Sequence, residues 1–136
     1  MSQIRHLSGR ISERLYKESG VDIFNGAQGR ILYVLWEHGQ LTITELGRLT
    51  SLAKTTLTGM LDRMEAGGLV KRIPDKKNRR QIFIAVTAKA KGYRDKYDWL
   101  SGRMSEIFYT GFSGEEITAF EDQLRRILKN LENEGV

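Results

Sequence analysis

The feature that most constrains this chain is the order of patterns between residues 44 and 87. Two short helical repeats of apolar residues are followed by two strand-like segments that flank a basic loop. This order predicts a helix-turn-helix followed by a β-hairpin, which we call the wing. Such an arrangement would place positive charge and short hydroxyl side chains where a nucleic-acid duplex could receive them.

Length and composition exclude several classes of function. A chain of 136 residues suggests one domain with one core, and the absence of cysteine excludes a disulfide framework, a thiolate metal site and thiol-oxidation sensing. The two histidines, His6 and His38, lack zinc-ligand spacing, and no nucleophile–base pair or phosphate-binding loop is found, so we expect no metal, no cofactor and no enzyme activity. With no long apolar run and a polar N-terminus, the chain is expected to be cytoplasmic and not bound to a membrane.

The helical part of the chain is predicted from apolar periodicity and end signals. Helices are expected over about residues 3–18, from after Asn25 to about residue 37, over 42–49 and over 54–66. The third has the capping-box spacing Thr42-x-x-Glu45 at its start. The fold class is therefore mainly α, an α+β winged helix-turn-helix lobe with additional helices at both ends.

The helix predicted over 54–66 has two contrasting faces. Leu57, Met60, Leu61 and Met64 cluster on one side of a helical wheel and are expected in the core. The other side is rich in threonine, a mediocre helix former, whose hydroxyl and methyl groups can approach base edges closely. A merely polar face is the alternative. The candidate DNA contacts on this helix are Lys54, Thr55, Thr56 and Thr58.

The wing is predicted from a glycine pair, two strands and a basic loop. Gly67 and Gly68 end the helix, a strand covers residues 69–73, Pro74 breaks it, and a strand over 81–86 follows the loop 75–80. Segment 71–80 holds six lysines or arginines against one aspartate, a field that attracts a polyanion. A solvated loop is the alternative for a basic run taken alone. The candidate DNA contacts of the wing are Arg72, Lys76, Lys77, Arg79 and Arg80.

These segments together resemble the MarR family of bacterial winged-helix transcription regulators over nearly the whole chain. The strongest likeness is in Leu41-Thr-Ile-Thr-Glu-Leu and in Leu57-Thr-Gly-Met-Leu-Asp-Arg-Met-Glu-Ala-Gly-Gly-Leu-Val, followed by the wing up to Thr87. The resemblance implies that the helix 54–66 reads the major groove, that Arg80 sits at the wing, and that Arg63 faces the DNA backbone or supports the wing. The chain departs from the family pattern at Ala53, where a capping serine is usual and Ser51 is a weak substitute, and at Gly59, Asn78 and Ala90.

The C-terminal third predicts a second function, dimerisation. A long helix is expected from about Ala88 to Tyr109, and another begins at Ser113 with a capping-box Glu116. The second carries an apolar stripe that a single small lobe could not cover, and intrachain packing is the alternative to a second subunit; the family resemblance also implies a two-fold dimer. In this reading residues 1–136 form one domain, with a DNA-binding lobe at about 41–87 and dimerisation helices at about 3–18 and 88–134. The candidate dimerisation residues are Ile4, Leu7, Ile11, Leu15, Phe120, Leu124, Ile127, Leu128 and Leu131.

The sequence therefore predicts a homodimeric, sequence-specific regulator that binds a pseudo-palindromic operator in double-stranded DNA. The resemblance implies a repressor that releases DNA on binding a small aromatic or anionic effector. Two alternatives remain at this point: a non-specific architectural nucleic-acid binder, and a winged-helix module that binds an acidic protein. Core packing is the alternative for the aromatic residues that could line an effector cleft. The candidate cleft residues are Tyr16, Arg30, Tyr33, Trp36, Tyr97 and Trp99.

Overall fold

A computed structural model describes residues 1–20 and 26–135. By its internal contacts the chain forms two units, residues 1–101 and 102–136. The predicted N-cap Asn25 lies outside the described residues. Among the helices that the structure describes, none is long and apolar enough to cross a membrane.

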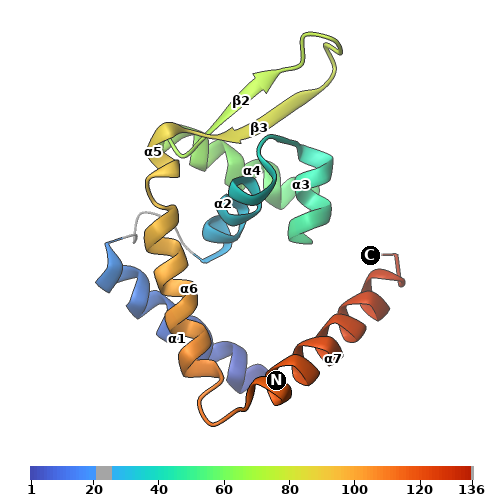
Figure 1. Cartoon of the computed structure of the whole chain (residues 1–136). Coiled ribbons are helices and arrows are strands. Elements are labelled where there is room, and N and C mark those ends of the chain that lie inside the picture. Colours follow the sequence, from blue (N-terminus) through green and yellow to red (C-terminus); the bar gives the residue numbers. More distant parts are fainter. Residues whose placement is uncertain (21–25, 136) are drawn as a thin grey trace. The chain divides into compact units, whose positions relative to one another are not determined.

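The first unit holds a helical core and a small sheet. Its helices are α1 (Ser2–Ser19), α2 (Gly26–His38), α3 (Ile43–Thr50), α4 (Lys54–Ala66) and α5 (Ala88–Lys91). Its strands are β1 (Leu41–Thr42), β2 (Val70–Pro74) and β3 (Ile82–Val86), which form an antiparallel sheet in the order β1-β3-β2. Helices α2, α3 and α4 contact the sheet from one side (Figure 1). The mainly helical winged helix-turn-helix expected from the sequence is confirmed.

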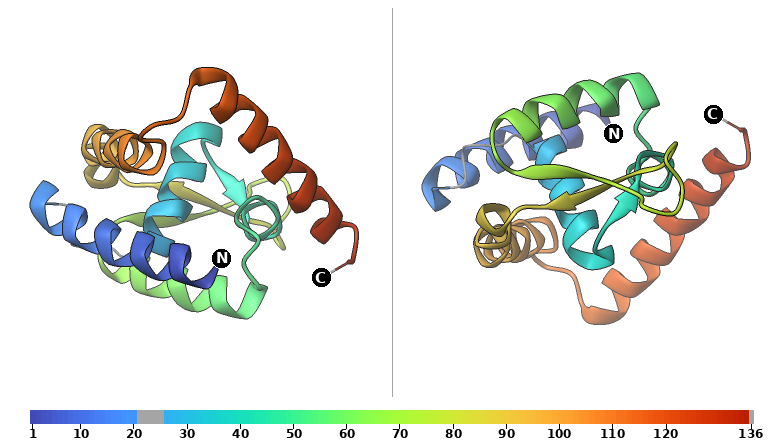
Figure 2. Two further views of the ribbon diagram at one scale, coloured as in Figure 1. Left: turned by 90° about the horizontal axis from the view of Figure 1, so that it is seen from below. Right: turned by 90° about the horizontal axis from the view of Figure 1, so that it is seen from above.

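The core of this unit joins the helix-turn-helix to the wing. Leu46 of α3, Leu57 and Leu61 of α4 and Ile84 of β3 are all fully buried. α4 lies beside β2 (Figure 2). Burying each of these side chains stabilises the fold by roughly 1.5–3 kcal/mol. Because the apolar face of α4 is held in the core in this way, the polar face of α4 remains at the surface.

The strands differ from the expectation at two points. Pro74 was predicted to end the first wing strand before it, but it is the last residue of β2 and pairs with Ile82. β2 is an edge strand, where a residue without an N–H group is tolerated. Strand β1 was not predicted, because two residues are too few to show alternation; Leu41 of β1 pairs with Ile84.

Thr42 ends β1 and also begins α3. Its side chain accepts a hydrogen bond from the Glu45 backbone N–H at 3.2 Å, which is the hydroxyl half of the predicted capping box.

The single long helix predicted from Ala88 to Tyr109 is wrong. The chain forms α5, then leaves the helix at Gly92 and Tyr93 before α6 (Arg94–Phe108). The backbone N–H groups of Gly92 and Tyr93 bond three residues back, to Lys89 at 3.2 Å and Ala90 at 3.1 Å, which tightens the last turn of α5 and ends it.

The second unit contains the end of α6 and the helix α7 (Gly114–Glu132). The predicted capping box is confirmed: Glu116 N–H donates to the Ser113 hydroxyl at 3.1 Å, and Ser113 N–H donates to the Glu116 carboxylate at 2.9 Å. These bonds lower the pKa of Glu116. None of the residues of α7 is buried, although Phe120 makes ring contacts with Phe108, Tyr109 and Phe112.

Candidate nucleic-acid interface

The outer face of α4 carries short polar side chains. Lys54, Thr55 and Thr56 are exposed in its first turn, while Leu57 is fully buried in the turn's inner side. The N-cap residue is Ala53, whose side chain cannot cap the helix, so the first N–H groups of α4 have no side-chain partner there. Such groups, together with the positive end of the helix dipole, favour an anion.

The suggestion that Ser51 caps α4 is wrong. Ser51 adopts a left-handed conformation with φ 59° and ends α3 instead. This residue therefore makes the turn between the two helices of the helix-turn-helix. Among the described non-glycine residues, no other has a positive φ angle.

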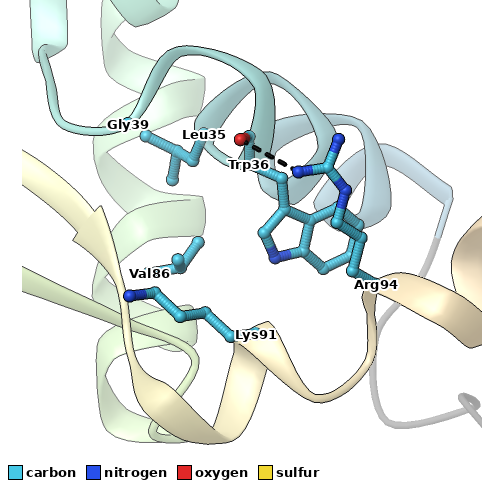
Figure 3. A pocket seen from close by; sticks show the side chains of 6 residues that line it. All are labelled: Leu35, Trp36, Gly39, Val86, Lys91 and Arg94. Carbon is cyan, nitrogen blue, oxygen red and sulfur yellow. Dashed lines mark hydrogen bonds between the residues drawn. The ribbon is translucent and has the colours of Figure 1, made fainter.

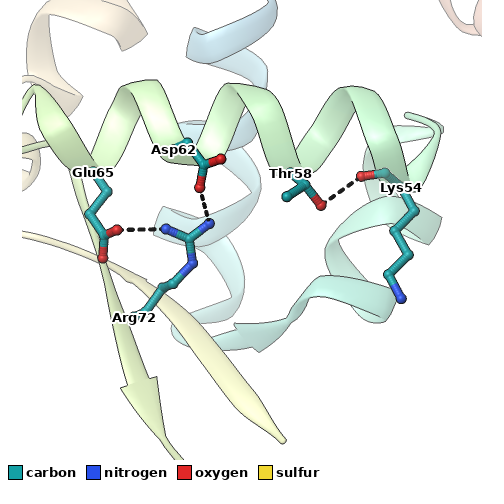
Figure 4. A network of polar contacts seen from close by, with 5 residues as sticks. All are labelled: Lys54, Thr58, Asp62, Glu65 and Arg72. Carbon is teal, nitrogen blue, oxygen red and sulfur yellow. Dashed lines mark hydrogen bonds and ion pairs between the residues drawn. The ribbon is translucent and has the colours of Figure 1, made fainter.

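Arg72 joins the wing to α4. Its guanidinium donates to Glu65 at 2.6 Å and to Asp62 at 2.7 Å, and these three side chains, which we call the clasp, lie on one edge of α4 (Figure 4). Partial burial lowers the pKa of Arg72, but the hydrogen bonds and charges of Asp62 and Glu65 more than offset this effect and raise the pKa above its usual value. Arg72, which was predicted to contact DNA, thus has its charge occupied within the chain and positions the wing.

The basic loop of the wing is closed by its own backbone and polar side chains. Asp75 N–H donates to the Gln81 carbonyl at 3.0 Å, and the Asp75 carboxylate accepts from Lys77 N–H at 2.8 Å. Asn78 accepts from the Arg80 N–H through its side-chain oxygen at 3.2 Å. The Asn78 side-chain oxygen therefore fixes the backbone of the wing arginine Arg80.

The remaining wing cations are available to a partner. No ion pair involving them occurs among the described residues, and all are exposed. The same holds for Arg63 on α4, whose Nη1 atom lies 3.8 Å from the position of a Cβ built on Gly59. The guanidinium of Arg63 therefore lies over the bare surface that the glycine leaves. The cations in question are Arg63, Lys76, Lys77, Arg79 and Arg80.

The predicted dimerisation residues divide into three groups by exposure. Leu15 is 4% exposed, so the chain itself supplies the cover that a second subunit was expected to give. This prediction is corrected. Ile11 and Phe120 are partly exposed. The rest of the set is exposed by 40–62%: Ile4, Leu7, Leu124, Ile127, Leu128 and Leu131.

The predicted effector residues other than Trp99 form a cluster in the first unit. The ring of Tyr97 lies 6.0 Å from that of Tyr33 and 5.4 Å from that of Trp36. Burial and the neighbouring Tyr33 raise the pKa of Tyr97, against an opposing effect of Arg30. Burial, followed by Tyr97, raises the pKa of Tyr16 to about 12. Four aromatic rings and one arginine are thus brought together.

Trp99 does not share in this cluster. It is 54% exposed, and no ring contact of Trp99 occurs among the described residues. Trp99 follows Tyr97 by two positions on α6, so the two side chains point to nearly opposite sides of that helix.

A cavity of about 200 Å³ lies beside Trp36 (Figure 3). Arg94 borders it and donates to the Trp36 carbonyl at 3.2 Å and to the Glu37 carboxylate at 2.6 Å. The helix break at Gly92 is what places Arg94 there, and sequence reasoning missed both. The cavity is lined by Leu35, Trp36, Gly39, Val86, Lys91 and Arg94.

Comparisons with known proteins identify relatives of the chain. The MarR family model matches residues 24–82. The HTH-type transcriptional regulator TtmR of Methylorubrum extorquens is 37% identical over 94 residues, which make up 69% of this chain and 47% of TtmR, so the match spans about half of that relative. An uncharacterized HTH-type transcriptional regulator of Bacillus subtilis, YsmB, is 30% identical, with 91% of this chain and 85% of YsmB covered.

A solved structure extends the likeness to three dimensions. The crystal structure of overoxidized AbfR bound to DNA matches with a TM-score of 0.71 and 26% identity, over 96% of this chain and 88% of AbfR. The family model covers both helices of the helix-turn-helix and most of the wing. This chain therefore belongs to the MarR family of winged helix-turn-helix transcriptional regulators.

Proposed function

We propose that this protein is a homodimeric repressor that binds a pseudo-palindromic operator in double-stranded DNA and releases it on binding a small effector. The observation that carries the proposal is the shared framework of α4 and the wing. The exposed hydroxyls of α4 and the unpaired cations of the wing lie on two elements that Arg72 holds together through Asp62 and Glu65. DNA in complex with AbfR, a relative in fold, supports this use of the surface.

The division of labour follows from groove chemistry. The first turn of α4 offers hydroxyl groups of a size that can reach base edges in the major groove, where each base pair shows a distinct pattern. The wing offers guanidinium groups on a loop, which suits phosphates and the narrow minor groove. α4 would supply most of the sequence preference, and the wing most of the salt-dependent affinity.

The dimer rests on exposed apolar side chains at both ends of the chain. Leu124, Ile127, Leu128 and Leu131 face outward along α7, and Ile4 and Leu7 do so on α1. A second copy of the chain presents the same apolar stripes, so it can cover these side chains in a two-fold dimer. Two copies related by a two-fold axis would present two recognition helices about one DNA turn, ~34 Å, apart. The proposal contains no catalytic step and places the protein in the cytoplasm.

The test of operator binding uses genomic fragments at one fixed salt concentration. A few fragments that contain inverted repeats should bind at least a hundredfold more tightly than the bulk. Arg80→Ala should weaken operator binding and reduce the salt slope by about one, whereas the matched control Lys129→Ala, on the polar side of α7, should change neither. A flat preference across fragments would favour an architectural binder. Full binding by Arg80→Ala and Thr55→Ala would favour a protein-interaction module.

The effector is assigned to the aromatic cluster around Tyr97 and the cavity beside Trp36. The chain has two tryptophans, so Trp99→Phe leaves Trp36 as the single fluorescent reporter. Benzoate, which has both an aromatic ring and a negative charge, should change this emission saturably and lower operator affinity over the same concentration range. Linkage requires that operator DNA weaken benzoate binding by the same factor. Emission that stays constant while benzoate releases DNA would exclude this location.

A further inference from the structure

The three threonines on the outer side of α4 differ in what their hydroxyls can do. Thr58 donates its hydroxyl hydrogen to the Lys54 carbonyl four residues back, at 2.8 Å (Figure 4). Thr55 and Thr56 stand in the first turn of α4, where the residue four positions back precedes the helix. No hydrogen bond of their hydroxyls occurs among the described residues. The hydroxyl hydrogen of Thr58 is therefore already used within the helix. The hydroxyls of Thr55 and Thr56 remain able to donate or accept a hydrogen bond.

The bond to Lys54 limits Thr58 to one role toward a ligand. A hydroxyl carries one hydrogen, and a carbonyl oxygen can only accept. The hydrogen of Thr58 is thus directed into the helix, and the outward part of the side chain is an oxygen lone pair and a methyl group. Asp62, another acceptor on the same edge four residues later, is held by Arg72, so it does not draw the hydrogen away from Lys54.

We infer that Thr58 acts as an acceptor-only reader of the operator and selects a base whose major-groove edge carries an amino group. Adenine N6 and cytosine N4 are the amino donors of that groove, whereas guanine presents only acceptors there. Thymine offers its O4 acceptor, which Thr58 cannot satisfy. This inference rests on the proposed function, since it assumes that α4 enters the major groove, and it names the base chemistry that one side chain prefers.

The experiment measures base preference at every operator position for three proteins. Each base pair of a half-site is replaced in turn by the other three, and binding is compared for the wild type, Thr58→Val and Thr58→Ser. Valine keeps the shape and the methyl group but has no acceptor; serine keeps the hydroxyl and the bond to Lys54. At one pair per half-site the wild type should prefer adenine or cytosine about fivefold to tenfold. Valine should abolish this preference and serine should retain it.

A base analogue tests the same contact from the DNA side. If the preferred base is adenine, a purine that lacks the 6-amino group should weaken wild-type binding about fivefold to tenfold and leave Thr58→Val unaffected. If it is cytosine, a pyrimidine that lacks the 4-amino group serves the same purpose. Thermal unfolding followed by circular dichroism confirms that the variants fold, and Thr58→Ala replaces the valine variant if that one does not.

The outcomes separate this inference from the proposed function. A sequence-specific wild type whose preferences are unchanged in Thr58→Val would overturn the role of Thr58 alone. The same role would be overturned if the preference that Thr58→Val loses were a preference for guanine. Guanine presents only acceptors in the major groove, so it requires a donor from the protein. A wild type with no sequence preference at any position would overturn both the inference and the proposed function.

Discussion

Arg72 on β2 and Asp62 on α4 are joined by an ion pair of 2.7 Å that bridges the wing and the recognition helix. The Arg72 side chain is 23% exposed, and Glu65 binds its other terminal nitrogen at 2.6 Å. Two carboxylates on one helix edge thus hold a planar guanidinium in a fork that lysine could not reproduce. The two ion pairs therefore fix the orientation of the wing relative to α4.

Removing one acid of the clasp should weaken DNA binding without removing any group that touches DNA. Asp62→Asn is expected to cost about 1 kcal/mol of unfolding free energy, because the ion pair is partly exposed, and to lower operator affinity several-fold by loosening the wing. Urea unfolding and operator titration measure the two effects. Asp98→Asn is the control, since Asp98 is also exposed and lies 4.0 Å from Arg94.

A direct role of Arg72 on DNA would give the opposite result. Asp62→Asn would then leave the guanidinium held by Glu65 alone and strengthen operator binding, and Arg72→Ala would reduce the salt slope by about one. If the clasp only positions the wing, operator binding by Arg72→Ala should have the same salt slope as that of the wild type.

The clasp also shows where sequence reasoning stopped. The bounds predicted for α4 match the structure, because an apolar repeat and a glycine pair are local signals. Whether Arg72 faces DNA or Asp62 depends on how β2 lies against α4, which no spacing in the sequence states. For the same reason Leu15 was expected at a subunit interface, although it is covered within the chain.

Gly59→Ala should stabilise the protein. Gly59 lies in the interior of α4, and outside the helix's own nearby backbone an added Cβ would meet only the Arg63 side chain, at 3.8 Å. Alanine in place of glycine inside a helix is worth up to about 1 kcal/mol, so the urea midpoint should rise. Gly20→Ala should do the reverse, because Gly20 has φ 76°. A loss of stability in Gly59→Ala would show that α4 needs the glycine for another reason.

Tyr16 should make the fold sensitive to alkali. Burial, followed by the nearby Tyr97, raises the pKa of Tyr16 to about 12 from its ordinary value of 10.0. Below pH 10 both the folded and unfolded states hold the proton, and the stabilising effect is complete. Between pH 10 and about 12 the unfolded state loses the proton first, so stability must fall as pH rises. Unfolding in urea across this window measures the slope.

The variant Tyr16→Phe isolates this effect. It removes the ionisable hydroxyl and should make the alkaline slope shallower, while the raised pKa of Tyr97 supplies the part of the slope that remains. A Tyr16→Phe slope equal to that of the wild type would place the alkaline transition elsewhere.

The candidate site was predictable to the extent that its signals are local. The basic loop and the threonines of α4 were identified from composition and helical phase. The position of Arg94 beside Trp36 was not, because the sequence of residues 88–109 reads as one helix. Its interruption places Arg94 against the end of α2, and that change of direction depends on tertiary contacts that a periodicity cannot encode.

Leu128→Glu should separate the two subunits. Leu128 is 50% exposed on the apolar side of α7, and a carboxylate there would be buried without a partner in the proposed dimer. Sedimentation should show a monomer over a concentration range in which the wild type is a dimer, and operator affinity should fall at least tenfold because one half-site is lost. Lys129→Glu makes a larger change of charge on the opposite side of the same helix and should remain dimeric. A dimeric Leu128→Glu with full operator affinity would mean that α7 directs this stripe away from the second subunit.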